Sequence, residues 1–540
     1  MRWFGALADT RCSQTHPYAR GIADTDVVVI GAGPNGLVAA NRLADAGWRV
    51  LVLEAQPEPG GAVRSEELAA PGFVADWGSS FYPLGFASPV LRSLDLEAHG
   101  LKWIWAPLPL AHPSPDGCAF VERGNVDATA ASLDAYAAGD GDHWRSLYHR
   151  WEKIGPAFLN MLLSPFPPVR GALRVARAAH VRIPWLTWYA LRSLRSATRG
   201  FKGGGGKLLL AGNTMHTDLA PPAASGALFG WLLASLAQEV GFPVPEGGAG
   251  RLTDALVTRL GTLGGEVRCN ERVTRIDVRD GRAVGVTTAD GTAIGVSQAV
   301  VADTSAPALY RDLLADQHLP WRVRRGLDRF RWDHGTVKVD WALDGTVPWI
   351  AEPARRAGTV HVADSLADID AYSEQIEAGL VPARPFLVVG QMTTTDPTRS
   401  PAGTETLWAY THVPQTVRGD AGEGITGRWD SGDAERMADR MEAEIEQRAP
   451  GFRALVRGRH VITPVDFQHG DANLVGGAIN GGTAALRQQL FLRPVPGLRG
   501  GASTFVDGLY LASASAHPGG GVHGAAGANA AHLALRNARS

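Results

Sequence analysis

A glycine-rich turn between two short apolar strands, within residues 26–54, constrains the fold more than any other part of the sequence. Residues 26–30 (DVVVI) form an apolar run typical of a buried parallel strand, and residues 31–36 (GAGPNG) follow as G-x-G-x-x-G. A helix ending at Gly47 and a second apolar strand, residues 49–53, lead to Glu54, which lies 23 residues after Gly31. This order predicts a dinucleotide-binding β-α-β unit.

Each position in this unit has a physical task. Gly31 permits the tight turn, Gly33 lets the backbone approach a pyrophosphate, and Gly36 lets the helix pack closely on the strand. The pyrophosphate is expected at the helix N-terminus, beside Pro34, where free N–H groups and the helix dipole favour an anion. Glu54, followed by Ala55, is expected to accept hydrogen bonds from an adenosine ribose. Because glycine makes up 65 of 540 residues, the ordered unit rather than the glycine pattern alone carries the prediction.

The residues after Glu54 favour FAD over a nicotinamide dinucleotide. Residues 60–64 read GGAVR, and a Gly-Gly at this offset resembles the extension found in FAD-binding oxidoreductases related to amine oxidases and phytoene desaturases. The chain contains no second dinucleotide fingerprint, so a bound nicotinamide cofactor is not expected. No cysteine pair follows the glycine turn, which excludes a redox-active disulfide beside the flavin, and the cysteine spacing predicts no metal site.

The length of the chain predicts more than one domain. We expect an α/β fold: a Rossmann-like FAD-binding domain with a parallel sheet and a three-stranded β-meander, and an inserted mixed α+β substrate domain. Asp280-Gly281 and Asp290-Gly291 are hairpin signals that predict the meander. The expected boundaries are a disordered extension at 1–24, a discontinuous FAD-binding domain at 25–105, 246–305 and 481–540, and a substrate domain at 106–245 and 306–480.

A second strand–loop–helix unit lies near the C-terminus. Residues 508–512 (GLYLA) predict a buried strand, residues 517–522 (HPGGGV) a glycine loop, and residues 524–536 an alanine-rich helix. The N-terminus of this helix can face an anion, and in a flavoprotein the relevant anion is reduced flavin. The alternative is a glycine-rich helix entry without a ligand. His517, beside the glycine loop, is the candidate catalytic residue, with a loop-capping role as the alternative.

Residues 154–217 combine basic and aromatic side chains without a single acidic residue. This composition predicts a segment that faces an anionic membrane surface, with a solvated basic face as the alternative. Nucleic acid is not expected as a partner, because the net charge is −2 and no recognised nucleic-acid-binding fold accompanies the basic residues. No apolar run is long enough for a transmembrane helix, so we expect a cytoplasmic protein, peripheral at a membrane.

Taken together, these motifs resemble the phytoene desaturase/carotenoid isomerase branch of flavin oxidoreductases. The resemblance is most specific in residues 26–64 and 508–530, and it is strongest to phytoene-dehydrogenase-related proteins of the pyridine nucleotide-disulphide oxidoreductase domain-containing protein 2 type. It implies that FAD is held near the following residues: Gly31, Gly33, Pro34, Gly36, Glu54, Ala55, Gly61, Ala62, Arg64 and the backbone at Val273. It also implies that Gly520, Gly521 and Val522 lie at the isoalloxazine ring.

The expected activity is an FAD-dependent oxidation, desaturation or isomerisation of a lipophilic, carotenoid- or isoprenoid-like substrate, with hydride transfer to flavin N5 and oxygen or a quinone as electron acceptor. The chain departs from the family pattern at Asn480-Gly481, where relatives often carry a histidine, and at Arg487-Gln488. These departures leave two alternatives open. One is a low-turnover flavin-binding regulatory or interaction protein, and the other is a carotenoid ketolase-like oxygenase.

Overall fold

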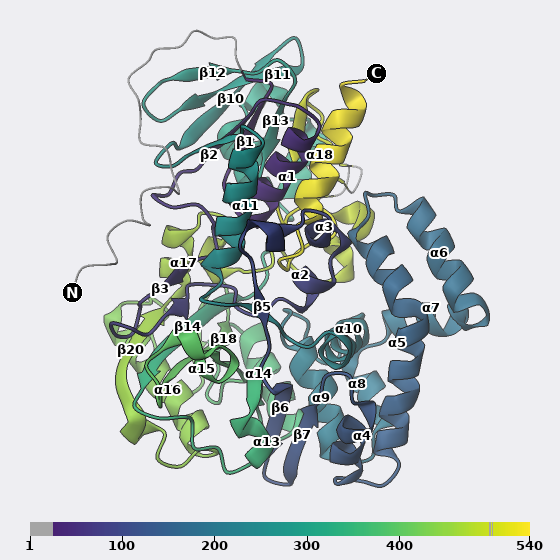
Figure 1. Cartoon of the computed structure of the whole chain (residues 1–540), viewed down its shortest axis with the longest axis vertical. Helices are drawn as coiled ribbons and strands as arrows, with labels where there is room; N and C mark the ends of the chain where they lie inside the picture. Colours follow the sequence, from purple (N-terminus) through teal and green to yellow (C-terminus); the bar gives the residue numbers. More distant parts are fainter. Residues whose placement is uncertain (1–24, 496–497, 499–500, 540) are drawn as a thin grey trace.

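A five-stranded parallel sheet forms the centre of the upper part of the molecule in Figure 1. The structure, a computed structural model, describes residues 25–495, 498 and 501–539, so the extension expected at 1–24 lies outside the described residues. The strands follow the order β21-β13-β1-β2-β9. Their bounds are β1 (Val27–Ile30), β2 (Val50–Leu53), β9 (Glu266–Arg268), β13 (Ala299–Ala302) and β21 (Leu509–Leu511).

Alternate residues of these strands pack into two different cores. Val27 and Val29 face helices α1 (Pro34–Asp45), α11 (Gly250–Thr262) and α18 (Ala525–Asn537). Val28 and Ile30 face the opposite side, which the antiparallel meander covers. The meander consists of β10 (Val273–Arg279), β11 (Arg282–Thr288) and β12 (Ala293–Gly295). The predicted Rossmann-like sheet, glycine-turn helix and three-stranded meander are thereby confirmed.

A seven-stranded mixed sheet lies below the parallel sheet, in the order β20-β14-β18-β17-β15-β6-β7. Its strands are β6 (Leu108–Ser114), β7 (Gly117–Val121), β14 (Gly335–Leu343), β15 (Ala357–Val362), β17 (Leu387–Gln391), β18 (Glu405–Val413) and β20 (Val456–Ile462). Strand β18 shows how the side chains alternate: Leu407 and Ala409 pack with α16 (Ser431–Glu446), whereas Trp408 belongs to the core beneath the helical layer.

The helical layer on the other side of this sheet is built mainly from residues 126–239. Its helices are α4 (Val126–Asp134), α5 (Asp140–Leu163), α6 (Val169–Ala179), α7 (Ile183–Leu191), α8 (Leu194–Ala197), α9 (Gly204–Thr214) and α10 (Gly226–Glu239). Phe158, Tyr189 and Phe201 are buried here. The prediction that the aromatic residues of 154–217 face a membrane is therefore wrong for these three. Their side chains lie in the core of the helical layer. Within the described residues, every helix is too short or too polar to cross a bilayer.

Shorter elements of the described chain connect these layers. They include β3 (Ser65–Glu66), β4 (Ala75–Asp76), β5 (Trp103–Ile104), β8 (Val244–Pro245), β16 (Leu380–Val381), β19 (Gly419–Asp420), α2 (Pro83–Ala87), α3 (Pro89–Arg92), α12 (Trp321–Leu327), α13 (Glu352–Arg355), α14 (Leu366–Glu377), α15 (Met392–Thr395) and α17 (Pro464–Gly470). Elements α2, α3 and α17 matter most for the site, because they lie between the two sheets (Figure 1).

Candidate functional site

The glycine turn joins β1 to α1 at the carboxyl edge of the parallel sheet. Gly31 has a φ of +94°, which side-chain-bearing residues rarely adopt, and Pro34 begins the helix. A Cβ on Gly36 would lie 2.2 Å from the Gly31 carbonyl oxygen, and a Cβ on Gly33 would lie 2.8 Å from Oδ2 of Asp303. A side chain at position 36 would therefore require the backbone to move, whereas one at position 33 would have to displace the Asp303 carboxyl group, and with glycine at both positions backbone forms the surface of the turn.

Glu54 follows β2 at the same edge and is 8% exposed. Its Oε2 accepts a hydrogen bond from the backbone N–H of Ala32 (2.7 Å), and its Oε1 accepts one from Gln56 (2.9 Å). Burial raises the pKa of Glu54, while these hydrogen bonds oppose the rise. A carboxylate offers about four acceptor positions, so Glu54 can still accept bonds from ribose hydroxyls. Glu271 donates its N–H to the Glu54 carbonyl (2.8 Å), which brings the start of β10 at Val273 to this end of the site.

The Gly-Gly extension folds back onto the glycine turn. The N–H of Gly60 donates to the Ala32 carbonyl (2.9 Å), and a Cβ on Gly61 would lie 3.4 Å from Cα of Gly33. Arg64 stacks on Trp77 at 4.4 Å, and its Nη1 donates to the Gly470 carbonyl (3.2 Å). The buried Nε of Arg64 makes no hydrogen bond within the described chain; it lies 3.7 Å from Glu66 Oε1. The Arg64 guanidinium, which has an N–H group free to donate a hydrogen bond, thus lies close to the turn.

The C-terminal glycine loop reaches the same region from the other side of the sheet edge. Helices α1 and α18 lie side by side (Figure 1), and both follow strands of one parallel sheet, so both begin at its carboxyl edge. A Cβ on Gly524, at the start of α18, would lie 2.8 Å from a methyl group of Val38 in α1. A Cβ on Gly85 of α2 would lie 2.9 Å from the Val522 carbonyl, and Gly521 faces Leu84.

A buried polar cluster holds residues 479–482 against this loop, and its tertiary partners were missed at the sequence level. A Cβ on Gly520 would lie 2.6 Å from Oδ1 of Asn480. Asp333 accepts hydrogen bonds from the N–H groups of Ile479, Asn480 and Gly482 (2.8–3.0 Å), and burial raises its pKa to about 6. Arg493 donates to the Asn480 carbonyl (2.9 Å). Among the described residues, Nδ2 of the Asn480 side chain has no hydrogen-bond partner. A buried donor is therefore available beside Gly520.

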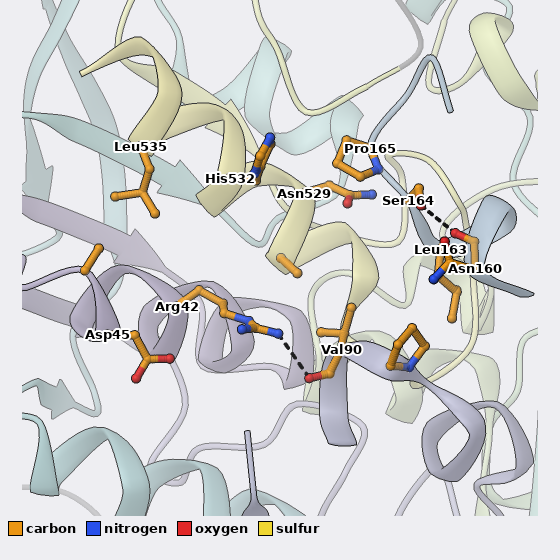
Figure 2. A pocket seen from close by; sticks show the side chains of 13 residues that line it. Arg42, Asp45, Val90, Asn160, Leu163, Ser164, Pro165, Asn529, His532 and Leu535 are labelled. Carbon is orange, nitrogen blue, oxygen red and sulfur yellow. Dashed lines mark hydrogen bonds between the residues drawn. The ribbon is translucent and has the colours of Figure 1, made fainter. Parts of the chain in front are cut away.

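His517 is buried, and its ring packs against Phe166 at 5.5 Å. Burial lowers its pKa to about 4, so the imidazole is neutral at physiological pH, and its Nε2 lacks a hydrogen-bond partner in the part of the chain described. His517 lines a cavity of about 290 Å³ that shares Pro165, Asn529 and His532 with a cleft of about 490 Å³. Figure 2 shows this larger cleft between α1, α3, the end of α5 and α18.

These residues fit an extended FAD. The side-chain-free backbone at Gly33 and Gly36, the buried acceptor Glu54 and the underused Arg64 lie at one end. The predicted residues that the structure brings together there are Gly31, Gly33, Pro34, Gly36, Glu54, Ala55, Gly61, Ala62, Arg64 and Val273. Gly520, Gly521 and Val522 lie apart from these, beside α2 and Asn480. The glycine turn and Arg64 can donate hydrogen bonds to a diphosphate. Glu54 can accept hydrogen bonds from a ribose on one side of it, and the C-terminal glycine loop lies on the other.

Two family models match the chain. The model described as NAD(P)-binding Rossmann-like domain matches residues 29–95, and the model described as flavin containing amine oxidoreductase matches residues 196–411. These matches make the chain similar to the flavin-dependent oxidoreductases that include the phytoene desaturases, and it is an FAD-dependent oxidoreductase.

Individual relatives cover nearly the whole chain. The mouse (Mus musculus) pyridine nucleotide-disulfide oxidoreductase domain-containing protein 2 is 27% identical over 568 residues, spanning 95% of this chain and 94% of its own. The neurosporene-forming phytoene desaturase of Rhodobacter capsulatus is 27% identical, spanning 92% and 90%. The crystal structure of an oxidoreductase from Methanosarcina mazei superposes with a TM-score of 0.59 at 17% identity, covering 95% of this chain and 100% of that one. This last likeness concerns the fold alone.

Proposed function

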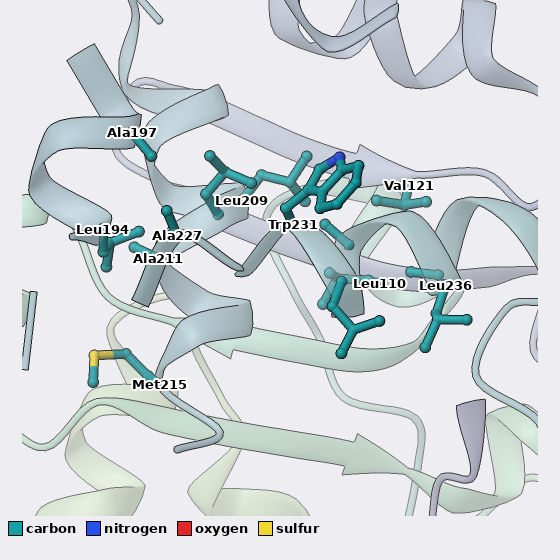
Figure 3. Packing of buried hydrophobic residues seen from close by; sticks show 14 of the residues in the cluster. Leu110, Val121, Leu194, Ala197, Leu209, Ala211, Met215, Ala227, Trp231 and Leu236 are labelled. Carbon is teal, nitrogen blue, oxygen red and sulfur yellow. The ribbon is translucent and has the colours of Figure 1, made fainter. Parts of the chain in front are cut away.

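We propose that the protein acts on a lipophilic, carotenoid- or isoprenoid-like substrate and catalyses its desaturation, dehydrogenation or isomerisation. The observation that carries this proposal is the candidate FAD site, whose residues come from three distant segments, beside a large apolar region. Figure 3 displays part of that region, in which Leu209, Met215 and Trp231 pack between helices and the seven-stranded sheet. The similarity to a phytoene desaturase supports the substrate class.

The roles of the site residues are part of the same proposal. Bound FAD would supply the hydride acceptor, at flavin N5. The turn at Gly31, Gly33, Pro34 and Gly36 would hold the pyrophosphate, together with Gly61, Ala62 and Arg64. Glu54 and Ala55, with the backbone at Val273, would hold the adenosine, and Gly520, Gly521 and Val522 would face the isoalloxazine. The FAD-binding domain would then comprise 25–105, 246–305 and 481–540, and the substrate domain 106–245 and 306–480.

His517 is our choice for the residue that receives the substrate proton. Forming a C=C bond removes a hydride from one carbon and a proton from its neighbour. The neutral imidazole of His517 carries an unpartnered Nε2 that can take up the proton. Its pKa of about 4 makes it a weak base. A weak base suffices when hydride loss leads, because the electron-poor carbon skeleton then releases the proton readily. Oxygen or a quinone would serve as the final electron acceptor.

Access for a lipophile is proposed through the cleft of Figure 2. Its lining combines apolar side chains such as Val90, Leu163 and Leu535 with Arg42 and His532, and the adjoining cavity reaches His517. Residues Val169 and Leu173 of α6, which begins just after the cavity-lining Pro167, are exposed. A substrate that leaves a lipid phase would therefore remain in contact with apolar side chains on its way inward.

Peripheral membrane binding through α6 and α7 is the corresponding proposal for the basic segment 154–217. Large apolar side chains are exposed on these two helices: Val169, Leu173, Ile183, Trp188 and Leu191. The same helices and their ends carry exposed arginines that can attract anionic headgroups, among them Arg170, Arg174 and Arg177. Flotation with anionic liposomes at low salt tests this: protein that stays in the soluble fraction would contradict it.

A low-turnover flavin-binding protein is the second proposal, and Asn480 favours it, because this side chain packs on Gly520 at a place where the family pattern leads us to expect a histidine. The two proposals differ in how fast the reduced flavin protein is reoxidised. The enzyme proposal expects photoreduced protein to be reoxidised rapidly by oxygen or a quinone and to convert a lipophile, which mass spectrometry of extracted ligands would identify. Photoreduced protein that neither acceptor reoxidises would favour the second proposal, and oxygen incorporated into the product would indicate a ketolase.

A further inference from the structure

The carboxyl group of Asp303 lies directly behind the glycine turn. Asp303 follows β13, and its N–H donates to the Ile30 carbonyl (2.8 Å). The three fingerprint glycines all face it: a Cβ on Gly31 would lie 3.0 Å from its carbonyl oxygen, and a Cβ on Gly33 or Gly36 would lie 2.8 or 3.0 Å from Oδ2. The absence of side chains at these three positions thus makes room for a carboxyl group inside the protein.

Asp303 also caps α1 from a distant part of the sequence. Within the described chain, no side chain of the helix's own N-terminal residues caps it; the N-cap position is Gly33. Oδ2 of Asp303 instead accepts a hydrogen bond from the N–H of Gly36, at 2.7 Å. A side-chain acceptor at this position stabilises a helix because the first N–H groups have no intrahelical partner. A structural role for Asp303 is therefore built into the turn.

The charges around Asp303 are unfavourable to its ionised form. It is buried, and the charged groups that face it are two further carboxylates, Glu54 at the end of β2 and Asp471 just after α17. The first turn of α1 carries no acidic side chain, and the cation Arg64 acts on Asp471. Burial is the main cause that raises the pKa of Asp303 to about 8, and the bond from Gly36 opposes the rise.

A pyrophosphate at the N-terminus of α1 adds negative charge on the other side of the same turn. A neutral carboxylic acid still offers an oxygen to the Gly36 N–H, so the cap survives protonation. An ionised carboxylate would repel the diphosphate across a backbone that carries no side chains. We propose that Asp303 is a positioning residue that must hold a proton for FAD to stay bound, so that flavin retention depends on pH.

The direction in which FAD affinity changes with pH follows from the linkage between FAD binding and proton binding. FAD raises the proton affinity of Asp303 further, so binding takes up a proton wherever the free protein has lost it. Affinity is fully present below a pH of about 8 and falls as pH rises above that value, by roughly tenfold per pH unit for one proton. A purely structural cap would leave FAD affinity independent of pH in this range.

The test is the dissociation constant of FAD, measured by quenching of flavin fluorescence from about pH 6 to about pH 9.5. We expect the wild type to lose roughly fivefold in affinity between pH 8 and pH 9 and close to tenfold per pH unit above that. Asp303→Asn, which keeps an oxygen for Gly36 and cannot ionise, is expected to bind FAD equally well at all of these pH values. Asp471→Asn is the second variant: it removes one repelling carboxylate, so it is expected to retain the pH dependence with an onset at lower pH.

Wild-type affinity that stays constant to about pH 9.5 would overturn the role of Asp303, and so would a slope that persists in Asp303→Asn. If that variant does not fold, calorimetry of the wild type in buffers of different ionisation enthalpy counts the protons directly. About one proton taken up per FAD near pH 9 and almost none near pH 6.5 is expected; no uptake at either pH contradicts the proposal. Absence of FAD binding at every pH would contradict the proposed function as well, whereas pH-independent binding would contradict this inference alone.

Discussion

Gly36→Ala is the substitution for which the structure gives the clearest expectation. The new Cβ would lie 2.2 Å from the Gly31 carbonyl oxygen, which is about 1 Å closer than carbon and oxygen normally approach. Because that oxygen belongs to the backbone, α1 has to move away from β1. Such overpacking costs about 1–3 kcal/mol, partly offset by the gain of about 0.5–1 kcal/mol from alanine in a helix. We therefore expect a loss of about 1–2 kcal/mol in the free energy of unfolding.

The effect on FAD is expected to be larger than the effect on stability. A helix displaced by about 1 Å no longer aims its N–H groups at the pyrophosphate. Losing one hydrogen bond to a charged group costs about 1.5–3 kcal/mol, which corresponds to roughly 10- to 100-fold in the dissociation constant. Thermal unfolding of the FAD-free protein and fluorescence titration with FAD measure the two effects separately.

Gly261→Ala is the matched control, because Gly261 lies in α11 and a Cβ there would have no described atom within 4 Å. It should gain about 0.5–1 kcal/mol in stability and bind FAD as the wild type does. A Gly36→Ala protein with unchanged thermal stability and wild-type FAD affinity would refute the argument that close packing of α1 on β1 creates the cofactor site.

Three further substitutions test other parts of the account. Gly520→Ala places a Cβ 2.6 Å from Oδ1 and 2.8 Å from Cα of Asn480 and should weaken FAD binding about tenfold. Because the Cα remains in Asn480→Ala, adding that change should recover only part of the affinity, and wild-type affinity in Gly520→Ala would show that Asn480 is not an obstacle. Leu173→Glu, at a position 55% exposed on α6, should reduce binding to anionic liposomes about tenfold, while Ile350→Glu, 68% exposed elsewhere, should leave it unchanged. Asp333→Asn leaves fewer acceptors for three buried N–H groups and should cost about 1–3 kcal/mol of unfolding free energy; an unchanged melting temperature would contradict this.

The local elements of the fold could be predicted from the sequence because their signals are local. Gly31 ends one buried strand and Glu54 follows the next, and Asp280-Gly281 has the two positive φ angles that its hairpin needs, 49° and 78°. The aromatic residues of 154–217 show the limit of such reading. The segment has the composition of a membrane-facing surface, but two of its aromatic residues, Phe158 and Phe201, are buried in the helical layer.

The polar partners of the site could not be predicted because they come from distant positions. Asp303 accepts a hydrogen bond from Gly36, which is 267 residues away in the sequence, and Asp333 accepts one from Ile479, which is 146 residues away. Neither carboxylate belongs to a sequence motif. The role of each can be recognised only from its tertiary hydrogen bonds. Only the three-dimensional structure reveals that the glycines expected to bind the cofactor also make room for a buried carboxyl group.

The central claim is that one FAD binds across the edge of the parallel sheet. The most direct measurement is the flavin absorbance of the purified protein after reconstitution with FAD and removal of excess, compared with its protein concentration. The account predicts one FAD per chain in the wild type and strongly reduced retention in Gly36→Ala. A wild-type protein that retains no flavin after reconstitution would contradict it.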